Sequence, residues 1–292
     1  MRRLIVNADD FGLTRGVNQA IIEAHTRGVV TSTTLMANSQ AFDDAVDLAQ
    51  RHPDLSVGCH LMLVDGEPLL PPDEINTLID PRDGRHFYRD ISTFALRLLR
   101  GKVNRGHIEA EAFAQIRRLQ DAGIGVSHLD SHKHTHLFPS VLRPVLSAAR
   151  ESGVRAIRNP FGRVAFRMVA SRPGLWKRYS QLEVLNSLAG KFRRVIAKAG
   201  MVTTDGSLGV AATGALDDAL FRMLIENLPE GTWEFVSHPG YSDADLDKIH
   251  TRLHESREAE LKLLTAAATR ELIESKQIQR ISFRNLSLAE AA

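Results

Sequence analysis

The sequence predicts an α/β fold in which parallel strands alternate with helices. Apolar runs of strand length alternate with longer segments whose apolar residues recur every three or four positions. Polar clusters follow the strand-like runs, and ligand sites in parallel α/β sheets and barrels lie at the carboxyl ends of the strands. We therefore expect an α/β sheet or barrel with a functional site at that end.

The opening of the chain has a β-α-β-α-β pattern. Leu4 to Val6 is a strand-like run, and Val17 to Arg27 has helical spacing. A second strand is expected over Thr33 to Met36, a helix over Phe42 to Arg51 and a third strand over Ser56 to Leu61. Such units place consecutive strands in parallel.

The middle of the chain is less regular. A Pro- and Asp-rich loop from Leu69 to Asp90 is expected to lie over the site, and a helix is expected over Ile108 to Ala122. Ile124 to Val126 is a short strand-like run. The segment from Asn159 to Gly200 lacks a clear strand and predicts a loop followed by a helix around Trp176 to Ala199.

The last third supplies the remaining predicted elements. Trp233 to Val236 is a strand, Thr251 to Ser275 is a long amphipathic helix, and Ile278 to Phe283 is a closing strand. There is no internal repeat and no convincing linker. We expect one domain over residues 1–292.

Composition narrows the class of protein. The chain has 43% hydrophobic and 25% charged residues, as soluble globular proteins have. No apolar stretch approaches the roughly 18 residues that span a bilayer, and the apolar run after Met1 is too short for a secretory signal. Cys59 is the single cysteine, which excludes an intramolecular disulfide framework and fits a reducing cytoplasm.

The net charge of +2 hides a basic segment. Between Arg150 and Gly200 there are twelve Lys and Arg against Glu151 and Glu183, a local charge of +10, which leaves −8 for the rest. Apolar and aromatic residues interleave with the cations, so this amphipathic insertion could meet an anionic membrane. Nucleic acid has less support because no nucleic-acid-binding motif accompanies the charge. A helical insertion whose arginines face water is the alternative.

Four of the twelve histidines and an aspartate lie between His128 and His136. In an extended chain His132, His134 and His136 would share one face. Imidazole is the commonest transition-metal ligand, and Asp130 could bind a metal or orient a ligand. The segment predicts a metal site, with a solvated polar loop as the alternative.

Asp9 and Asp10 directly follow the first predicted strand. A turn there can bring both carboxylates to one site, where one binds a metal and the other takes a proton. The alternative is a pair of turn or helix-capping residues. His60 and His238 also end strand-like runs, and each alone is more often structural. The convergence of four polar clusters at predicted strand ends favours one shared site.

Together these motifs resemble the YdjC-like (ChbG) carbohydrate deacetylases. The resemblance covers nearly the whole chain and is carried by Asn7-Ala8-Asp9-Asp10-Phe11-Gly12, Gly58-x-His60-Leu61, His128-Leu129-Asp130-Ser131-His132-x-His134-x-His136 and Ser237-His238-Pro239-Gly240. It implies a distorted TIM-like β/α barrel of the polysaccharide-deacetylase type, with the basic helical segment at about 150–200 as an insertion. It also implies removal of acetyl groups from N-acetylated amino sugars, and a homodimer would be in keeping with the family.

The resemblance also implies roles for individual residues. The metal triad would comprise one carboxylate and two imidazoles, from Asp10, His60 and His132. Asp9 would be the general base and His238 the candidate general acid. The remaining acidic and histidine side chains of the His-rich segment become candidates for orienting ligands or contacting substrate: Asp130, His134 and His136.

Such a triad suits hydrolysis of an amide with one divalent metal ion. Three protein ligands leave positions for water and the acetyl oxygen. The base takes the proton of the water, and the acid protonates the departing amine. We expect zinc or magnesium, while manganese, cobalt and nickel also suit an open O/N site.

Within the family the chain is most similar to the hopanoid-biosynthesis-associated (HpnK) branch. The similarity lies in Leu35-Met36-Ala37, in Leu63-Val64-Asp65-Gly66 and in a long middle region. It implies a glycolipid substrate, an N-acetylglucosaminyl hopanoid, and a cytoplasmic enzyme that makes peripheral contact with the inner membrane surface.

Three alternatives remain open. One is deacetylation of soluble chito-oligosaccharides. A metallo-phosphoesterase would need more ligands for a second metal, recruited from His134 and His136. A non-catalytic metal-dependent sugar- or lipid-binding protein would not require an acid and a base beside the triad.

Overall fold

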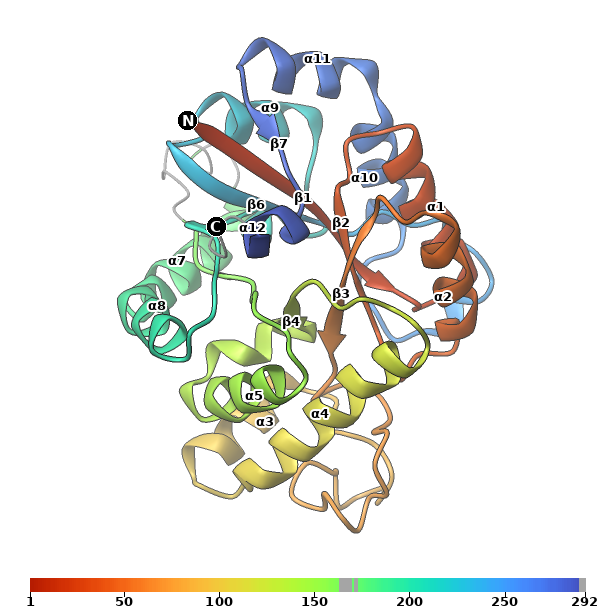
Figure 1. Ribbon diagram of the computed structural model, residues 1–292, viewed down its shortest axis with the longest axis vertical. Coiled ribbons are helices and arrows are strands. Elements are labelled where there is room, and N and C mark those ends of the chain that lie inside the picture. The colour runs from red at the N-terminus through yellow and green to blue at the C-terminus, as the bar shows by residue number, and fades with distance from the viewer. Residues whose placement is uncertain (163–169, 171–172, 289–292) are drawn as a thin grey trace.

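A parallel sheet forms the centre of the computed structural model, which describes residues 1–162, 170 and 173–288 (Figure 1). Its strand order is β4-β3-β2-β1-β6-β5, and β7 pairs with β1. The strands are β1 (Arg2–Phe11), β2 (Ser32–Leu35), β3 (Ser56–Leu61), β4 (Leu129–Ser131), β5 (Gly206–Leu208), β6 (Gly231–Ser237) and β7 (Gln279–Arg280). Every pairing between them is parallel.

Helices connect the strands and lie around the sheet. They are α1 (Arg15–Thr26), α2 (Phe42–Arg51), α3 (Ile91–Leu99), α4 (Arg105–Asp121), α5 (Pro139–Glu151), α7 (Pro173–Asn186), α8 (Ala189–Lys198), α9 (Asp218–Glu226), α10 (Glu255–Thr265), α11 (Ala267–Ser275) and α12 (Phe283–Leu288), with 3₁₀ turns η1 (His132–Leu137), η2 (Val210–Ala212) and η3 (Leu246–Lys248). Side-chain caps begin three of them, because Thr14, Asn104 and Asp217 each accept a backbone N–H of the first turn. None of the described helices is long and apolar enough to cross a membrane.

The segment 155–161 curls the sheet into a distorted barrel. On one side Arg158 N–H donates to Leu129 O of β4 (2.9 Å). On the other side Ile157 N–H donates to Val202 O (3.0 Å), and Ser207 N–H of β5 donates to Phe161 O (2.9 Å). These bonds join the two edge strands through a segment with only isolated bridges. The predicted α/β fold and TIM-like barrel are confirmed, and the irregular closing segment is the source of the distortion.

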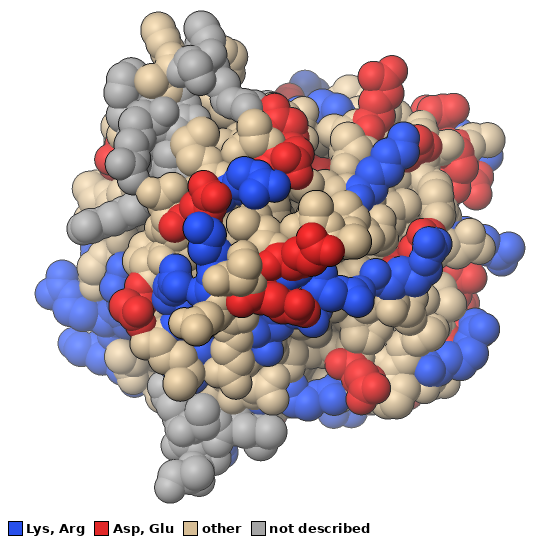
Figure 2. All heavy atoms as spheres, turned by 90° about the horizontal axis from the view of Figure 1, so that it is seen from above, with Lys and Arg blue, Asp and Glu red and all other residues tan. Residues whose placement is uncertain are grey.

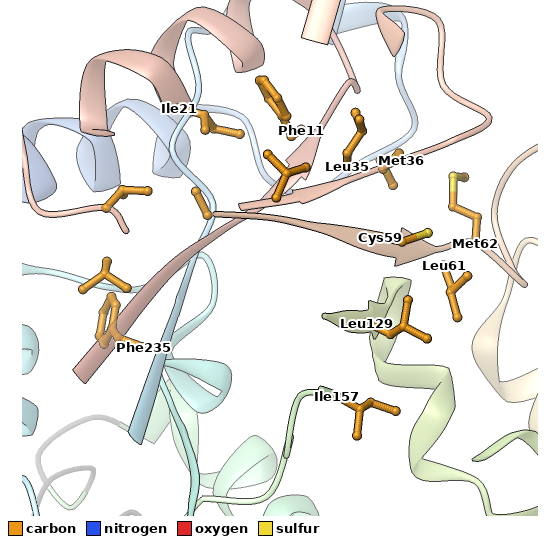
Figure 3. Packing of buried hydrophobic residues seen from close by; sticks show 14 of the residues in the cluster. Phe11, Ile21, Leu35, Met36, Cys59, Leu61, Met62, Leu129, Ile157 and Phe235 are labelled. Atoms are coloured by element: carbon orange, nitrogen blue, oxygen red, sulfur yellow. The ribbon is translucent and has the colours of Figure 1, made fainter. Parts of the chain in front are cut away.

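Buried side chains from both faces of the sheet hold the barrel together (Figure 3). Leu35 of β2, Leu61 of β3 and Phe235 of β6 are fully buried. Burial of each such side chain contributes roughly 1.5–3 kcal/mol. Cys59 is also fully buried, and burial raises the pKa of its thiol well above the usual value. It is therefore a packing residue of β3.

The predicted helix over Phe42 to Arg51 and strand over Ser56 to Leu61 match α2 and β3. Two other strand predictions were misplaced. The run at Ile124 to Val126 is irregular, and the strand is β4, three residues further on. In the predicted closing strand only Gln279 and Arg280 pair as β7, because Phe283 already begins α12.

Two predicted helices are each divided in two. The helix over Thr251 to Ser275 begins at Glu255 and breaks at Ala266, whose extended ψ of 136° ends α10 and starts α11. The helix around Trp176 to Ala199 consists of α7 and α8. Part of the basic insertion, including Phe166, Met168 and Val169, lies outside the described residues.

Candidate active site

The candidate site lies at the carboxyl ends of β1, β3, β4 and β6. Asp10, the next-to-last residue of β1, lies in the left-handed region (φ 68°), a conformation that costs a non-glycine residue free energy and is often found at functional sites. His60 lies on β3 and His132 follows β4, while His238 follows β6. Parallel pairing therefore brings together the polar clusters that the sequence placed at separate strand ends.

The three predicted metal ligands face one another. Asp10 Oδ1 lies 3.5 Å from His60 Nε2 and 3.7 Å from His132 Nδ1. One ligand atom from each residue lies within 4.8 Å of the other two. Asp10 and His60 are buried, whereas the His132 side chain is 22% exposed. The triad is thus fixed on one side and open to solvent on the other.

The donor set fits a divalent metal ion. Ligands about 2.0–2.2 Å from a tetrahedral ion lie roughly 3.3 Å apart, close to the two separations seen here. Buried carboxylates also outnumber the guanidiniums beside the triad: Asp9, Asp10 and Asp130 against Arg158 and Arg257. In the metal-free protein the His60 imidazolium, whose pKa is raised to about 9, supplies the balancing charge, and a divalent ion can take over that part.

Asp130 lies beside His60. Its Oδ1 lies 2.7 Å from His60 Nδ1, while Thr34 Oγ1 donates to its Oδ2 (3.2 Å). Burial would lower the pKa of His60, but Asp130 raises it to about 9. Without a metal both ring nitrogens therefore carry a proton at neutral pH, and a metal ion would displace the proton on Nε2, which faces Asp10, while Asp130 keeps the proton on Nδ1. Asp130 therefore lies within hydrogen-bond distance of His60, and its orienting role stays a prediction.

A buried arginine that the sequence analysis missed holds Asp9. Arg158 donates to both oxygens of Asp9 (2.8 and 2.6 Å), and Asn7 Nδ2 donates to Oδ1 (2.9 Å). Burial would raise the pKa of Asp9, but Arg158 holds it well below its usual range. Asp9 is therefore ionised at neutral pH and fixed in direction.

Arg158 also contacts two further carboxylates. Its Nη1 lies 2.5 Å from Asp130 Oδ2, and its Nη2 lies 2.7 Å from Glu234 Oε1. Burial raises the pKa of Glu234 to about 7 in spite of this contact. The sequence offered one signal for the pair: Glu234 is a lone acid within the apolar run Trp233 to Val236.

The Arg158 contacts also bear on metal stoichiometry. Oxygen or nitrogen atoms of Asp9, His60 and Asp130 lie close enough together to hold an ion. However, Arg158 already contacts both of these carboxylates, so its charge stands where a second ion would be needed. This arrangement favours one metal ion rather than two.

Arg257 of α10 is the second buried arginine that the sequence did not reveal. Its Nη2 donates to Asp10 Oδ2 (2.6 Å), which leaves Oδ1 facing the two histidines. Burial would raise the pKa of Asp10, but Arg257 keeps it well below its usual value. Asp10 is thus held ionised, with Oδ1 left free of Arg257 and directed at the two histidines.

His238 lies beside Asp9 at the mouth of the site. Its Nε2 is 3.8 Å from Asp9 Oδ2, and its side chain is 13% exposed. Glu260 of α10 fixes the backbone, because His238 N–H donates to Glu260 Oε2 (2.6 Å). His238 Nδ1 has no hydrogen-bond partner among the described residues. The ring is therefore positioned near both the base candidate and solvent.

The His-rich segment is not extended, so the prediction that its three histidines share one face was wrong. It forms η1, in which Lys133 and His134 have a φ of 52°. Lys133 Nζ contacts Asp65 Oδ2 (2.6 Å), and Asp65 Oδ2 lies 3.9 Å from His132 Nε2. The turn directs only His132 of this segment to the triad.

Of the other histidines of the segment, two are fully buried and His134 is half-buried. His136 is fully buried, and its Nδ1 lies 2.6 Å from Ser131 Oγ. Burial lowers the pKa of His134 to about 3, so this ring stays neutral. His128 is also fully buried and stacks on Phe283 with ring centroids 3.6 Å apart. His134 lies closest to the predicted role of a substrate contact, because part of it remains exposed.

Comparison with known proteins identifies the family of this chain. The model of the YdjC family, described as YdjC-like protein, matches residues 3–275. A carbohydrate deacetylase from Brevibacillus brevis is 33% identical over 97% of this chain and 99% of its own length. One from Thermoanaerobacter pseudethanolicus is 31% identical over 91% of each chain.

Solved structures agree with the family match. A crystal structure of an Enterococcus faecalis V583 protein, provisionally assigned to cellobiose-phosphate cleavage, superposes with a TM-score of 0.77 at 28% identity over 98% of each chain. The lactam utilization protein from Thermus thermophilus, with a TM-score of 0.52 at 13% identity over 96% of this chain and 99% of its own, shares the fold alone. The family match and the curated relatives together establish that the chain belongs to the YdjC-like family of carbohydrate deacetylases.

Proposed function

We propose that the protein removes the acetyl group from an N-acetylated amino sugar with the help of one divalent metal ion. One observation carries this proposal: Asp10, His60 and His132 converge on one point, with an ionised carboxylate and a histidine beside them. Binding alone requires no acid and base next to a metal. A divalent ion in this triad would supply an acidified water and stabilise negative charge on the acetyl oxygen.

Asp9 and His238 divide the proton transfers. Asp9 accepts the proton of the attacking water, because its carboxylate is ionised and Arg158 and Asn7 fix its direction. His238 donates a proton to the sugar nitrogen as the C–N bond breaks, since an amine leaves poorly as an anion. Asp9 Oδ2 and His238 Nε2 lie 3.8 Å apart on the same side of the site, so they could reach neighbouring atoms of one amide group.

Acetate release tests the proposal. Wild-type protein loaded with zinc, manganese or magnesium is assayed on N-acetylglucosamine glycosides beside Asp9→Asn. The variant should keep its metal and lose at least about a hundredfold in turnover, as removal of a general base does. A wild-type protein that holds one metal ion yet releases no acetate from any glycoside would refute the deacetylase proposal.

A lipid-linked amino sugar is the finer substrate proposal, and an N-acetylglucosaminyl hopanoid is its most specific form. It is supported by the resemblance to the hopanoid-associated branch and by the basic, apolar surface of α5 and α8 near the site. A soluble chito-oligosaccharide is the competing substrate. Rates of acetate release from matched soluble and lipid-linked glycosides decide between them, and a preference for the soluble glycoside would remove the lipid proposal.

A further inference from the structure

A groove runs between α5 and α8 on the outside of the barrel. It contains two adjoining cavities of about 330 and 270 Å³ that share Arg143 and Val195. Its floor is apolar and includes Leu137, Leu142, Leu146, Leu188 and Phe192. Phe192 is buried, and its ring lies 6.1 Å from that of His136 in η1. The groove is therefore separate from the metal triad but joined to it through η1.

Five exposed cations line this groove: Arg105, Arg143, Arg150, Lys191 and Lys198. None of them forms an ion pair with an acid in the described part of the chain. Elsewhere on the surface cations do have such partners, as in Arg27 with Glu23 and Arg117 with Asp121. In the view from above, basic side chains gather at the left edge, the side on which α7 and α8 lie in Figure 1 (Figure 2). An uncompensated row of cations over an apolar floor is suited to an anionic amphiphile.

Exposed apolar side chains lie on the helices next to the groove in sequence. Leu96 and Leu99 of α3 are 46% and 83% exposed, and five residues separate Leu99 from Arg105. On α7, Trp176 and Val184 are 46% and 72% exposed. Such side chains beside basic residues are typical of helices that enter the interface of a membrane. A soluble anion has no hydrocarbon that could cover these apolar side chains.

We propose that this groove binds the head group of an anionic phospholipid and docks the protein on a membrane. The lipid phosphate meets Arg105, Arg143 and Lys191, while the adjoining hydrocarbon lies against Leu188 and Phe192. Leu99 and Val184 enter the bilayer beside it. Because α5 starts at Pro139, directly after η1, the docked membrane lies next to the mouth of the site.

This inference deepens the proposal of a lipid-linked substrate, and its test does not depend on acetate release. Vesicles of phosphatidylcholine alone are compared with vesicles that also contain phosphatidylglycerol, in sedimentation assays at low and high salt. The full-length protein should bind only the acidic vesicles and should be released by salt.

Paired charge reversals locate the binding surface. R143E/K191E should weaken binding to acidic vesicles at least about tenfold, because each basic residue near an anionic surface contributes roughly a fivefold factor. The matched control R222E/K262E reverses two exposed cations on α9 and α10 and should leave binding unchanged. Leu99→Ser should weaken binding by roughly tenfold through loss of apolar insertion. All variants should keep the acetate release of the wild type from a soluble glycoside.

Three outcomes would overturn the proposal. The wild type could fail to bind acidic vesicles at low salt, or the control reversal could weaken binding as much as the groove reversal. Soluble glycerol phosphate could also displace the protein from vesicles, which would make the groove a site for a free anion. Vesicle binding by a protein that releases no acetate would instead leave this inference intact while the proposed function fails.

Discussion

The two buried arginines on either side of the site differ in how completely their surroundings neutralise them. Arg158 contacts Asp9, Asp130 and Glu234, so the carboxylates around it outnumber its charge. Arg257 has one carboxylate partner among the described residues, Asp10, and its Nη1 has no hydrogen-bond partner there. Both side chains are fully or almost fully buried.

The difference separates a supporting network from a binding site. Around Arg158 every carboxylate is held by the guanidinium and buried, and Asp9 alone of the three also borders the open side of the site, beside His238. Beside Arg257, Asp10 uses one oxygen for the ion pair and presents the other to His60 and His132. An ion can enter only where a carboxylate oxygen remains free, which favours the Asp10 side as the proposed metal centre and gives the Arg158 side a supporting role.

Asp10→Ala should produce the largest change. It removes the oxygen shared by the triad and leaves Arg257 buried without its carboxylate, so metal binding and acetate release should fall by at least about a thousandfold. Metal content by atomic emission and acetate release measure the two effects. Asp54→Ala, at an exposed position, is the control. Retention of one tightly bound ion by Asp10→Ala would place the centre elsewhere.

Arg158→Met and Arg257→Met compare the two sides directly. Loss of Arg158 leaves three buried carboxylates without their cation and should lower the free energy of unfolding by about 3–5 kcal/mol, measured in urea at pH 7. Added zinc should restore much of the stability of Arg257→Met, because the ion would neutralise Asp10. It should restore little in Arg158→Met. Equal rescue of both variants would contradict the separation of the two sides.

Asp130→Asn should weaken metal binding by about ten- to a hundredfold, the usual cost of losing a carboxylate that orients a histidine ligand. His60 would keep its place on β3 but lose the acceptor that fixes its tautomer. Competition with a chelator of known affinity measures the change. An unchanged affinity would show that the strand alone orients His60.

Glu234→Gln should change how stability depends on pH. The pKa of Glu234 is raised to about 7 in the folded protein, above the ordinary 4.5. Below pH 4.5 Glu234 is protonated in both the folded and the unfolded protein, and its full contribution to stability is present. As the pH rises from 4.5 through 7 the unfolded chain releases this proton first, so the free energy of unfolding falls and that contribution is lost. The metal-free variant should gain about 2 kcal/mol relative to wild type between pH 5 and 8, measured by urea unfolding. If the free energies of unfolding of wild type and variant changed in parallel between pH 5 and 8, Arg158 would be keeping Glu234 ionised over that whole range.

Helices and strands were predicted correctly where the local spacing of apolar residues matches the face that is buried in the fold. Helix α2 carries its apolar residues at helical spacing, and β3 is a continuous buried run. The wrong predictions lie where tertiary contacts decide the structure. The segment 155–161 has no strand pattern, yet it joins β4 to the region around β5 because those strands leave their edges open.

The site was predictable as a set of strand ends but not as a charge network. Asp9, Asp10, His60 and His238 follow apolar runs and are visible in the sequence. Arg158 lies within a segment that looked like a basic insertion, and Arg257 lies in a helix rich in charges. Which arginine becomes buried depends on packing between distant elements, which no local pattern records.

Contacts at the end of the barrel opposite the site limit how early the chain can finish folding. Residues near position 280 pair with Arg3 and Leu4 of β1 as β7, and Phe283 N–H then donates to Ser32 Oγ at the start of β2. Phe283 also packs with Ile5 and Leu286 in a separate apolar cluster. A chain emerging from the ribosome cannot cover that end until the residues near position 280 have been made. Folding therefore has to wait for long-range contacts, and the open barrel would expose apolar surface to chaperones during synthesis.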